Sequence, residues 1–446
     1  MKKSFILLLT ILFSVSLFAD NIIKDNFYYS IDTITNTATI VDYDDSGLNV
    51  LGNVIIQREI VYNNKIYQIT SIGDNAFDCC HNIQSITIPR YITKIGKRAF
   101  YACSNLHNII YNSSELVSLG ESALDETLWL ENQPDGCVYF GNCLYKYKGE
   151  MPENTSIEVI DGTMSICCFA FQQCKNLVNI TLPNTLRLID RYAFAGCGFS
   201  SISIPNSVDS IGIMAFSNCM SLTNVELSTS LKILKSHVFN YCRALSSIDL
   251  SHITKIENGA FAFCSELNSV TFNEKLSIIN KFTFMNCKNL KRVTFPASLD
   301  SIGENAFYGC SGIEYMEVQA TTPPRIHRNT FDSVNRNIEF IVPAEAYNAY
   351  ATHEYWKVFM GEDKTFNEHI TYESQNIYYS SHDRTLYFNI NNPTSVIIYD
   401  TMGKTILNST IASTTKQLSI NLNNGIYIVN IITENQSTIQ TKIIVK

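Results

Sequence analysis

Nine pairs of a phenylalanine and a cysteine three residues later recur along this chain in two runs, with steps of 22 or 23 residues within each run. The first run holds Phe77/Cys80 and Phe100/Cys103. The second run holds Phe171/Cys174, Phe194/Cys197, Phe216/Cys219, Phe239/Cys242, Phe261/Cys264, Phe284/Cys287 and Phe307/Cys310. Similarity at a fixed period of roughly 20 to 50 residues is typical of stacked repeats. The chain is therefore predicted to form a solenoid, whose periodic residues serve stacking rather than catalysis.

Within one repeat, the apolar residues predict two short extended segments. Leu177, Ile180 and Leu182 outline the first, and Pro183 closes it because proline cannot donate to a β-ladder. The next apolar pair predicts the second segment, and Ala-Phe-x-x-Cys predicts one or two helical turns with Phe and Cys facing inward. A glycine such as Gly212 usually precedes that motif, which favours a positive φ there. Lysine and glutamate replace it in two copies and leave this inference open.

Nine of the fourteen cysteines occupy one equivalent repeat position, which argues against a disulfide framework. Stacked coils would place neighbouring Cα atoms about 4.8 Å apart, but in-register side chains point the same way and have no natural pairing. We predict free, packed thiols, which behave as small hydrophobic groups. Elsewhere, a two-residue turn at Gly141-Asn142 would pair Cys143 with Phe140 and leave Cys137 out of reach.

The N-terminus has the features of an export signal. Lys2 and Lys3 precede the apolar run Phe5 to Leu17, and Ala19-Asp20 offers a cleavage point. The run is shorter than the ~20 residues that span a bilayer. Residues 1–19 are therefore predicted to be a signal peptide, and the mature chain is predicted to have no transmembrane span. The net charge of −8 argues against nucleic acid as a partner.

The repeat consensus Ile-Gly-x-x-Ala-Phe-x-x-Cys-x-x-Leu-x-x-Ile-x-Ile-Pro resembles the BspA-type leucine-rich repeat of bacterial surface proteins, over residues 66–340. The resemblance implies a right-handed α/β solenoid of coils of about 23 residues, with a parallel sheet on one face. Residues 20–65 resemble its β-rich N-terminal cap and residues 341–360 its C-terminal cap. Between 104 and 161 the period slips around a Tyr-rich hairpin. This irregular insertion is either a binding feature or drift in a degenerate coil.

Beyond a predicted linker at 361–378, residues 379–446 alternate as a small all-β sandwich would. The segments Asp400 to Lys404, Leu422 to Tyr427 and Lys442 to Lys446 resemble the motifs of the C-terminal sorting domain of type IX secretion. This resemblance implies recognition by the secretion machinery, transport across the outer membrane, and either surface display or release.

Motifs for catalysis, cofactors and metals give little support for an enzyme. The eight histidines contain no pair at helical ligand spacing, and neither a Gly-x-Ser-x-Gly elbow nor a phosphate loop occurs. Asp42, Asp44, Ser46 and Gly47 match the opening of a calcium loop, but the twelfth position is Asn53 instead of glutamate. A solvated turn is the better interpretation. The chain is predicted to be non-enzymatic, with no catalytic residue, cofactor or metal.

The outward positions of the Leu-x-x-Ile-x-Ile strands are the remaining candidate site, because stacked coils align them in columns. This set, the sheet-face strip, comprises Thr181, Ser203, Glu226, Asp249, Thr271, Lys291, Arg292, Thr294, Tyr315 and Glu317. It is rich in hydroxyl groups and changes from acidic at Glu226 and Asp249 to basic at Lys291 and Arg292. Such a face can bind an extracellular protein or a glycan through many weak contacts. Ordinary solvation of each residue is the alternative.

The sequence thus predicts a secreted or surface-displayed, adhesin-like binding protein. A structural surface or spacer protein is one alternative, but it predicts a featureless sheet face. A hydrolase with its site in the insertion is another, which clustered carboxylates or a histidine pair would have supported.

Overall fold

The computed structural model describes residues 20–24, 27–41, 52–111, 118–360, 377–380, 384–388, 390, 392–400, 404–434 and 438–445. The chain divides into two compact units, Met1–Val342 with Asn348–Gly361, and Pro343–Tyr347 with Glu362–Lys446. The predicted signal peptide, the calcium-like loop from Asp42 and the predicted linker up to residue 376 lie outside the described residues. The domain boundaries assigned from the sequence stay predictions.

The first unit begins with a sheet that runs on into the coils. Its order is β1(Asp20–Lys24), β2(Phe27–Asp32), β3(Thr37–Val41), β6(Lys65–Ile72), β8(Lys94–Ile95) and β10(Ser118–Leu119), with β5(Glu59–Tyr62) paired to β6. β1 to β3 are antiparallel, whereas β3, β6, β8 and β10 pair in parallel. The Phe27 ring meets the Phe77 ring edge-on, with centroids 5.9 Å apart, and so covers the first ring of the repeat array.

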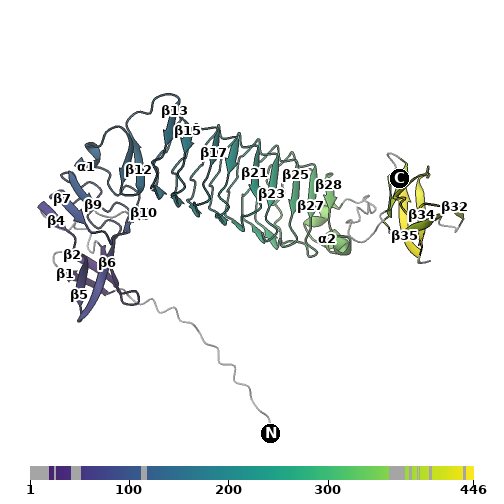
Figure 1. The fold of residues 1–446 in the computed structure, drawn as a ribbon, viewed down its shortest axis with the longest axis horizontal. Helices are drawn as coiled ribbons and strands as arrows, with labels where there is room; N and C mark the ends of the chain where they lie inside the picture. Colours follow the sequence, from purple (N-terminus) through teal and green to yellow (C-terminus); the bar gives the residue numbers. More distant parts are fainter. Residues whose placement is uncertain are drawn as a thin grey trace, which may run out of the picture. The chain divides into compact units, whose positions relative to one another are not determined.

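The coils carry two columns of parallel strands, visible side by side in Figure 1. The first column consists of β4(Gly52–Ile55), β7(Ile83–Ile88), β9(Asn108–Tyr111), β13(Thr155–Glu158), β15(Leu177–Thr181), β17(Ser201–Ser203), β19(Asn224–Glu226), β21(Ser247–Leu250), β23(Ser269–Phe272), β25(Arg292–Phe295), β27(Tyr315–Val318) and β28(Glu339–Ile341). The second column continues from β8 and β10 through two-residue strands: β14(Ser165–Ile166), β16(Leu188–Ile189), β18(Ser210–Ile211), β20(Ile233–Leu234), β22(Lys255–Ile256), β24(Ile278–Ile279) and β26(Ser301–Ile302). The predicted solenoid with a parallel sheet is confirmed, and so is the second extended segment.

Prolines close the first-column strands, as the sequence predicts. The carbonyl oxygens of Pro89, Pro183, Pro205 and Pro296 each accept a hydrogen bond from the N–H three residues later, at 2.9 to 3.1 Å. Each proline therefore opens a turn that leads the chain from the first column to the second.

The Ala-Phe-x-x-Cys segments form turns, so the predicted helical turns are wrong. The Cys80 N–H donates to Phe77 O (3.2 Å), but the Phe77 N–H donates to Ala99 O of the next coil (2.8 Å). Left-handed residues lie on both sides of the phenylalanine, at Asn75 (φ 57°) and Cys79 (φ 58°), and equivalent pairs recur in later coils. Because L-residues adopt this conformation singly and not in helices, a helix cannot propagate here.

The glycine before the turn serves close packing, so the expected positive φ is wrong as well. None of the glycines at this position has a positive φ: Gly73, Gly96, Gly120, Gly212 and Gly303. A Cβ atom on Gly212 would lie 2.3 Å from the backbone nitrogen of Arg191 in the preceding coil. Lys235 and Glu257 occupy the equivalent position in the two coils after Gly212, where the spacing leaves room for a side chain.

The interior is a column of stacked phenylalanine rings. From Phe171 to Phe331, successive ring centroids are 5.2 to 5.6 Å apart and the ring planes lie within 20° of parallel. All of these rings are buried. Burial of one such side chain stabilises the fold by about 1.5 to 3 kcal/mol, so each of these coils gains this contribution from its phenylalanine.

The repeat cysteines lie beside this column as free thiols. Seven of them donate Sγ–H to the carbonyl oxygen of the phenylalanine in the preceding coil, at 3.0 to 3.2 Å. All fourteen cysteines lie in the described part of the chain, and none of them forms a disulfide. Burial raises the pKa of Cys103, Cys197 and Cys264. These thiols therefore stay protonated and can act as hydrogen-bond donors.

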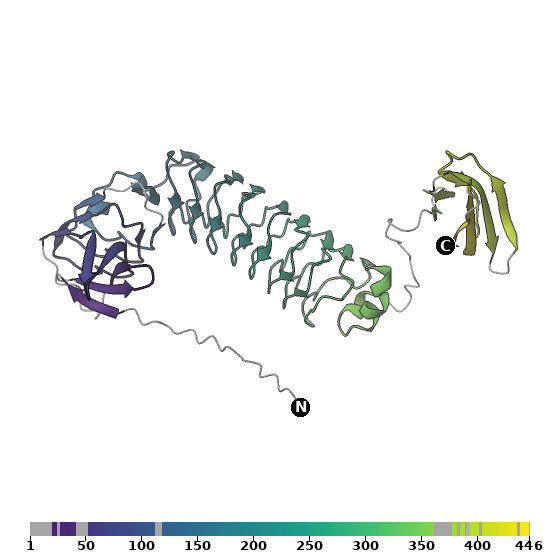
Figure 2. The ribbon, with the colours of Figure 1, turned by 60° about the horizontal axis from the view of Figure 1, so that its bottom comes forward.

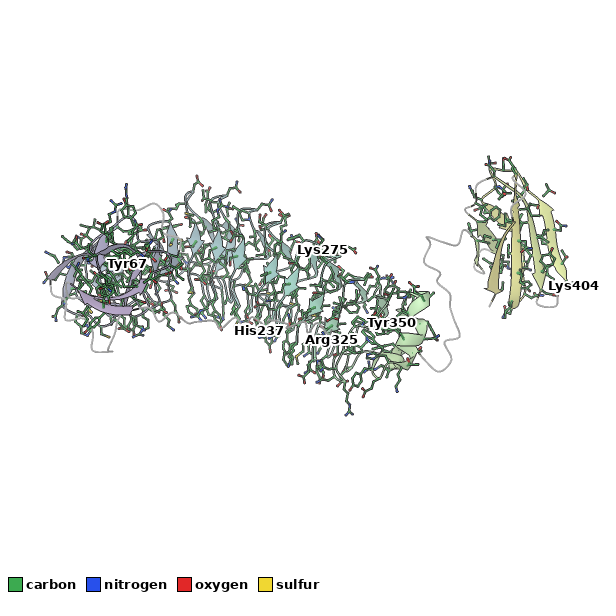
Figure 3. All side chains as sticks on the ribbon, turned by 90° about the horizontal axis from the view of Figure 1, so that it is seen from below. Tyr67, His237, Lys275, Arg325, Tyr350 and Lys404 are labelled. Carbon is green, nitrogen blue, oxygen red and sulfur yellow. The ribbon has the colours of Figure 1, made fainter. Side chains whose placement is uncertain are left out.

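Aromatic side chains cover the last coil. η1(Ala344–Ala346), α2(Tyr347–Thr352) and η2(Trp356–Phe359) follow β28. The Tyr350 hydroxyl donates to Ala320 O (2.8 Å), and the Trp356 indole N–H donates to Pro324 O (2.7 Å). Figure 3 shows Tyr350 at this end and Tyr67 in the N-terminal sheet. Both Tyr350 and Trp356 are fully buried, so each uses its polar atom to satisfy a buried carbonyl.

The irregular segment contains α1(Leu128–Glu131) and a hairpin of β11(Gly136–Phe140) and β12(Cys143–Lys148). The hairpin pairs Phe140 with Cys143 and Cys137 with Tyr147, as the predicted turn requires. β12 also pairs in parallel with β14. The hairpin is therefore built into the second column.

The second unit is a small antiparallel sandwich (Figure 2). One sheet has the order β29(Ile377–Ser380), β30(Thr385–Phe388), β33(Gln417–Ser419), and the other has the order β32(Thr405–Thr410), β31(Pro393–Asp400), β34(Gly425–Thr433), β35(Thr438–Val445). Leu386 and Phe388 of the first sheet share one core with Val396 and Val429 of the second. The predicted all-β C-terminal fold is confirmed.

Candidate functional site

Nine of the ten residues of the sheet-face strip lie in first-column strands, and Lys291 directly precedes β25. Parallel register places four pairs side by side: Ser203 with Glu226, Asp249 with Thr271, Arg292 with Tyr315, and Thr294 with Glu317. Eight of the ten strip residues are exposed, and Tyr315 and Glu317 are half-buried. The columns that the repeat predicts are present, whereas the binding role of the strip stays a prediction.

The end of the strip nearest the C-terminus is organised by contacts within the protein. The Arg292 guanidinium lies 3.7 Å from the centroid of the Tyr315 ring. The Tyr315 hydroxyl donates to Glu317 Oε2 (3.0 Å), and the Thr294 hydroxyl donates to the same oxygen (3.3 Å). Burial and the hydrogen bond to Glu317 raise the pKa of Tyr315 to about 12. The hydroxyl therefore remains a donor, and these four side chains are positioned before any ligand arrives.

Lys291 is paired within the protein, which sequence reasoning missed. Its Nζ lies 2.8 Å from Glu314 Oε1 in the next coil. The two side chains are 51% and 73% exposed, so the pair adds little stability. The signal that could have found it is an opposite charge 23 residues further along, in the same column.

Glu226 and Asp249 are the exposed acidic residues of the strip, and Asp249 Oδ1 accepts a hydrogen bond from the Ser251 N–H (2.9 Å). Neither forms an ion pair within the described residues. They occupy equivalent positions of adjacent coils, because the Ser246 N–H donates to Thr223 O (3.3 Å) three residues before each of them. Like charges side by side on a sheet are unfavourable. A cationic partner would relieve this repulsion.

The insertion carries a carboxylate that is already satisfied. Asp125 Oδ1 accepts hydrogen bonds from the Tyr145 hydroxyl (2.8 Å) and from Lys146 Nζ (2.6 Å). Burial acts to raise the pKa of Asp125, but these hydrogen bonds and the charge of Lys146 outweigh it and leave the pKa lowered. Asp125 thus anchors the hairpin. Among the described residues, no group of three or more His, Cys, Asp or Glu is arranged to hold a metal ion.

Two depressions, which the sequence did not predict, lie on the second column and at the end of the first unit. One, of about 370 Å³, is bounded by β24, β26 and residues 325–327. The other, of about 220 Å³, adjoins it and shares Ile326 and His327 with it. Their lining comes from coils separated by 22 to 24 residues in sequence and from η2, so no local motif marks them.

Some residues of the three sorting-domain motifs are described in the C-terminal sandwich, and two of them form hydrogen bonds within their own motif. The Lys404 N–H donates to Asp400 Oδ1 (2.9 Å), and the Tyr427 hydroxyl donates to Asn423 O (2.9 Å). Met402 and Gly403 lie outside the described residues. No helix in the described ranges combines the length and apolar character that crossing a membrane requires.

Comparison with known families gives two matches. The model of the BspA-type leucine-rich repeat region, which describes six copies, matches residues 21–149, 144–268 and 254–385. The model of the secretion system C-terminal sorting domain matches residues 378–446. Among curated proteins, no sequence matches this chain.

Several solved structures are similar to the chain. A leucine-rich cell surface protein from Faecalibacterium prausnitzii has 22% identity over 74% of this chain and 97% of its own, with a TM-score of 0.31. A leucine-rich repeat protein from Bacteroides ovatus has 23% identity over 74% of this chain and 80% of its own, with a TM-score of 0.34. The pneumococcal vaccine antigen PcpA has 18% identity over 75% of this chain and 96% of its own, with a TM-score of 0.33.

Proposed function

Because this chain belongs to the BspA-type leucine-rich repeat family and ends in a secretion sorting domain, we propose that it is a non-enzymatic, adhesin-like protein that binds an extracellular partner through the sheet-face strip. The sorting domain implies export to the cell surface or beyond it and contact with the type IX secretion machinery. Residues 1–19 are the proposed signal peptide for the first export step.

The observation that carries the proposal is the pair of exposed acids, Glu226 and Asp249, which form no ion pair among the described residues and lie on the same face as the Arg292–Tyr315–Glu317 network. The acids attract a basic partner and increase its rate of association. Arginine and tyrosine are the residues that most often dominate binding energy in protein interfaces. We therefore favour a protein partner with exposed lysine or arginine side chains.

A glycan is the second candidate partner. The hydroxyl groups of Thr181, Ser203 and Thr271 are exposed along the strip and can exchange hydrogen bonds with sugar hydroxyls. The alternative of a structural spacer assigns no partner to the strip and predicts that substitutions there leave all binding unchanged.

The test replaces Glu226, Asp249, Lys291 and Arg292 together with serine. An array of extracellular matrix proteins and glycans first identifies a ligand, and calorimetry then compares the variants. Loss of four charges and of one cation–π contact is expected to weaken binding about tenfold or more, with folding intact because all four side chains are exposed.

The matched control is the pair Asp209→Ser and Glu274→Ser, which removes exposed acids outside the strip. It is expected to leave affinity unchanged. Undiminished binding by the fourfold variant, or an equal loss in the control, contradicts the assignment of the strip as the binding face.

A further inference from the structure

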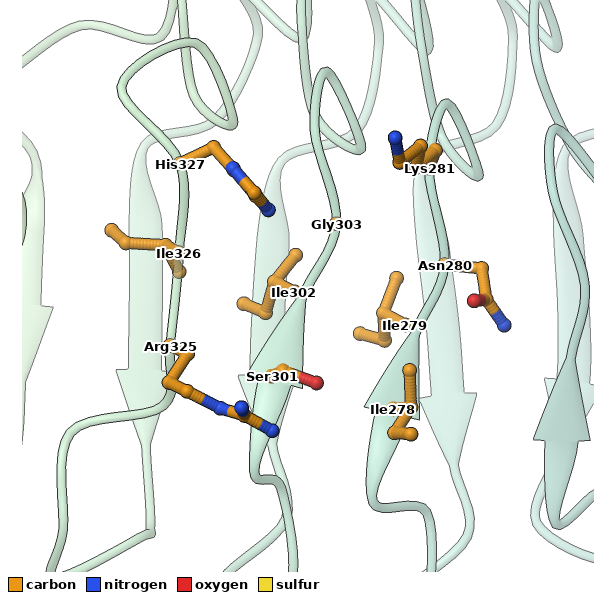
Figure 4. A pocket seen from close by; sticks show the side chains of 10 residues that line it. All are labelled: Ile278, Ile279, Asn280, Lys281, Ser301, Ile302, Gly303, Arg325, Ile326 and His327. Atoms are coloured by element: carbon orange, nitrogen blue, oxygen red, sulfur yellow. The ribbon is translucent and has the colours of Figure 1, made fainter.

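Basic side chains gather around the two adjoining depressions at the end of the first unit. Lys281, Arg325 and His327 line the larger one (Figure 4). The smaller one shares His327 and adds Arg328 and Arg336. No acidic residue lines the larger depression, and only Asp332 lines the smaller. The whole chain carries a net charge of −8, so this concentration of cations runs against its overall charge.

The larger depression is lined by a glycine at a point where neighbouring coils approach closely. Figure 4 shows Gly303 directly after β26, between the coil of Lys281 and the coil of His327, and shows Arg325 and His327 reaching toward the coil of β26. A Cβ atom at Gly303 would lie 2.6 Å from Lys281 N, so the coils are too close for a side chain. Ile278, which is 45% exposed, adds an apolar wall, and Ser301 adds a hydroxyl group.

Acidic residues at the rim neutralise these cations only weakly. Every side chain in the three rim ion pairs is at least 40% exposed: Arg325–Asp300 (2.6 Å), Lys281–Glu304 (3.5 Å) and Arg336–Asp332 (3.8 Å). Exposed pairs of this kind are worth little and exchange readily. Arg328 forms no ion pair within the described ranges. A carboxylate of a ligand can therefore replace these acidic partners and form ion pairs with the basic side chains.

The smaller depression adds a partly desolvated cation. The Arg336 guanidinium lies 4.8 Å from the centroid of the Phe359 ring, with its side chain 41% exposed. Val358, which is 42% exposed, and the half-buried Tyr355 form the other wall. Electrostatic attraction is stronger where water is partly excluded, so Arg336 is suited to hold an anion.

On the side that faces β26, the backbone of Arg325 is already paired. The Ile302 N–H donates to Arg325 O (2.8 Å), and the Arg325 N–H donates to Asp300 O (2.8 Å). A ligand that enters the larger depression therefore meets side chains, rather than free backbone groups of Arg325.

From this geometry we infer that the two depressions bind an acidic polysaccharide, with carboxylate-bearing sugar units in the two adjoining sites. The larger volume is at the lower end of the range for small-molecule sites, which is roughly 300 to 1,000 Å³. Arg325 and Lys281 in one site, and Arg328 and Arg336 in the other, take the carboxylates through charge-assisted hydrogen bonds. The exposed faces of Ile278 and Val358 take the apolar faces of the rings. This site lies on the second column and is separate from the sheet-face strip.

Calorimetry on the full chain tests the inference with polygalacturonate as the probe. Two ligand controls are its methyl ester, which lacks the charge, and poly-L-glutamate, which carries carboxylates on a peptide. The chain variants are Lys281→Gln with Arg325→Gln, and Arg328→Gln with Arg336→Gln. The matched control is Lys94→Gln on β8, because Lys94 is exposed at the repeat position equivalent to Arg325.

Each double variant is expected to weaken polygalacturonate binding about tenfold, while Lys94→Gln stays within about twofold. Methyl esterification is expected to remove binding. Equal affinity for the methyl ester, equal affinity for poly-L-glutamate, or undiminished binding by the double variants would overturn the inference. If a double variant melts early, Ser301→Glu replaces it, since it adds a carboxylate to the larger depression without removing a contact, and the same loss is expected.

Discussion

At the scale of single residues, the repeated cysteine both fills space in the core and donates a hydrogen bond. The carbonyl oxygen of Phe239 accepts the Cys242 N–H of its own coil (3.1 Å) and the Cys264 Sγ–H of the next (3.2 Å). A carbonyl has two lone pairs, so both are used. The sequence could predict that this cysteine faces inward. It could not predict the acceptor, which lies 25 residues away and depends on how the coils stack.

Cys264→Ala tests this role. The change removes the thiol from a fully buried site and leaves Phe239 O with one hydrogen bond, so the free energy of unfolding is expected to fall by about 2 kcal/mol. Urea unfolding followed by circular dichroism measures it. Cys79→Ala, at an exposed cysteine, is the control and is expected to change stability by less than about 0.5 kcal/mol. Similar losses at both sites would show that the buried thiol has no special role.

At the scale of elements, strands were predictable and turns were not. Apolar alternation and the closing proline mark the first-column strands directly. The turn failed because inward-facing residues three apart, such as Phe77 and Cys80, fit a helix and a tight turn equally well. What decides between them is the hydrogen bond from Phe77 N–H to Ala99 O in the next coil, which no local pattern encodes.

The candidate sites show the same division. Periodicity alone places Glu226 and Asp249 on one outward column, so the strip could be outlined from the sequence. The pairing of Lys291 with Glu314 and the hollow at Gly303 depend on the spacing between coils. The pattern of residue types along the sequence does not reveal the distance between neighbouring coils.

Gly212→Ala tests the close approach of coils. The added methyl group would lie 2.3 Å from Arg191 N, so neighbouring backbone must shift, and a loss of about 1 to 3 kcal/mol is expected. Lys235→Ala, at the equivalent position of the next coil, is the control and is expected to be nearly neutral because a side chain already fits there. Urea unfolding compares the two. A neutral Gly212→Ala would mean that glycine is not needed for packing at this position.

At the scale of the whole molecule, the coil array and the C-terminal sandwich have separate cores. Deletion of residues 372–446 should therefore leave the first unit folded but remove the sorting domain. We expect the truncated protein to accumulate in the periplasm. Cell fractionation and surface biotinylation measure this. Normal surface display of the truncated form would contradict the proposed role of the sorting domain in export.

The stacked phenylalanine column also has a mechanical consequence. Backbone hydrogen bonds among the described coils join each coil to its neighbours, so tension applied along the array loads one backbone interface at a time. A terminal coil that peels away releases about 23 residues, or roughly 75 Å of extended chain. Held at both ends in flowing liquid, the protein would lengthen stepwise, and each step would lower the force on whatever it grips.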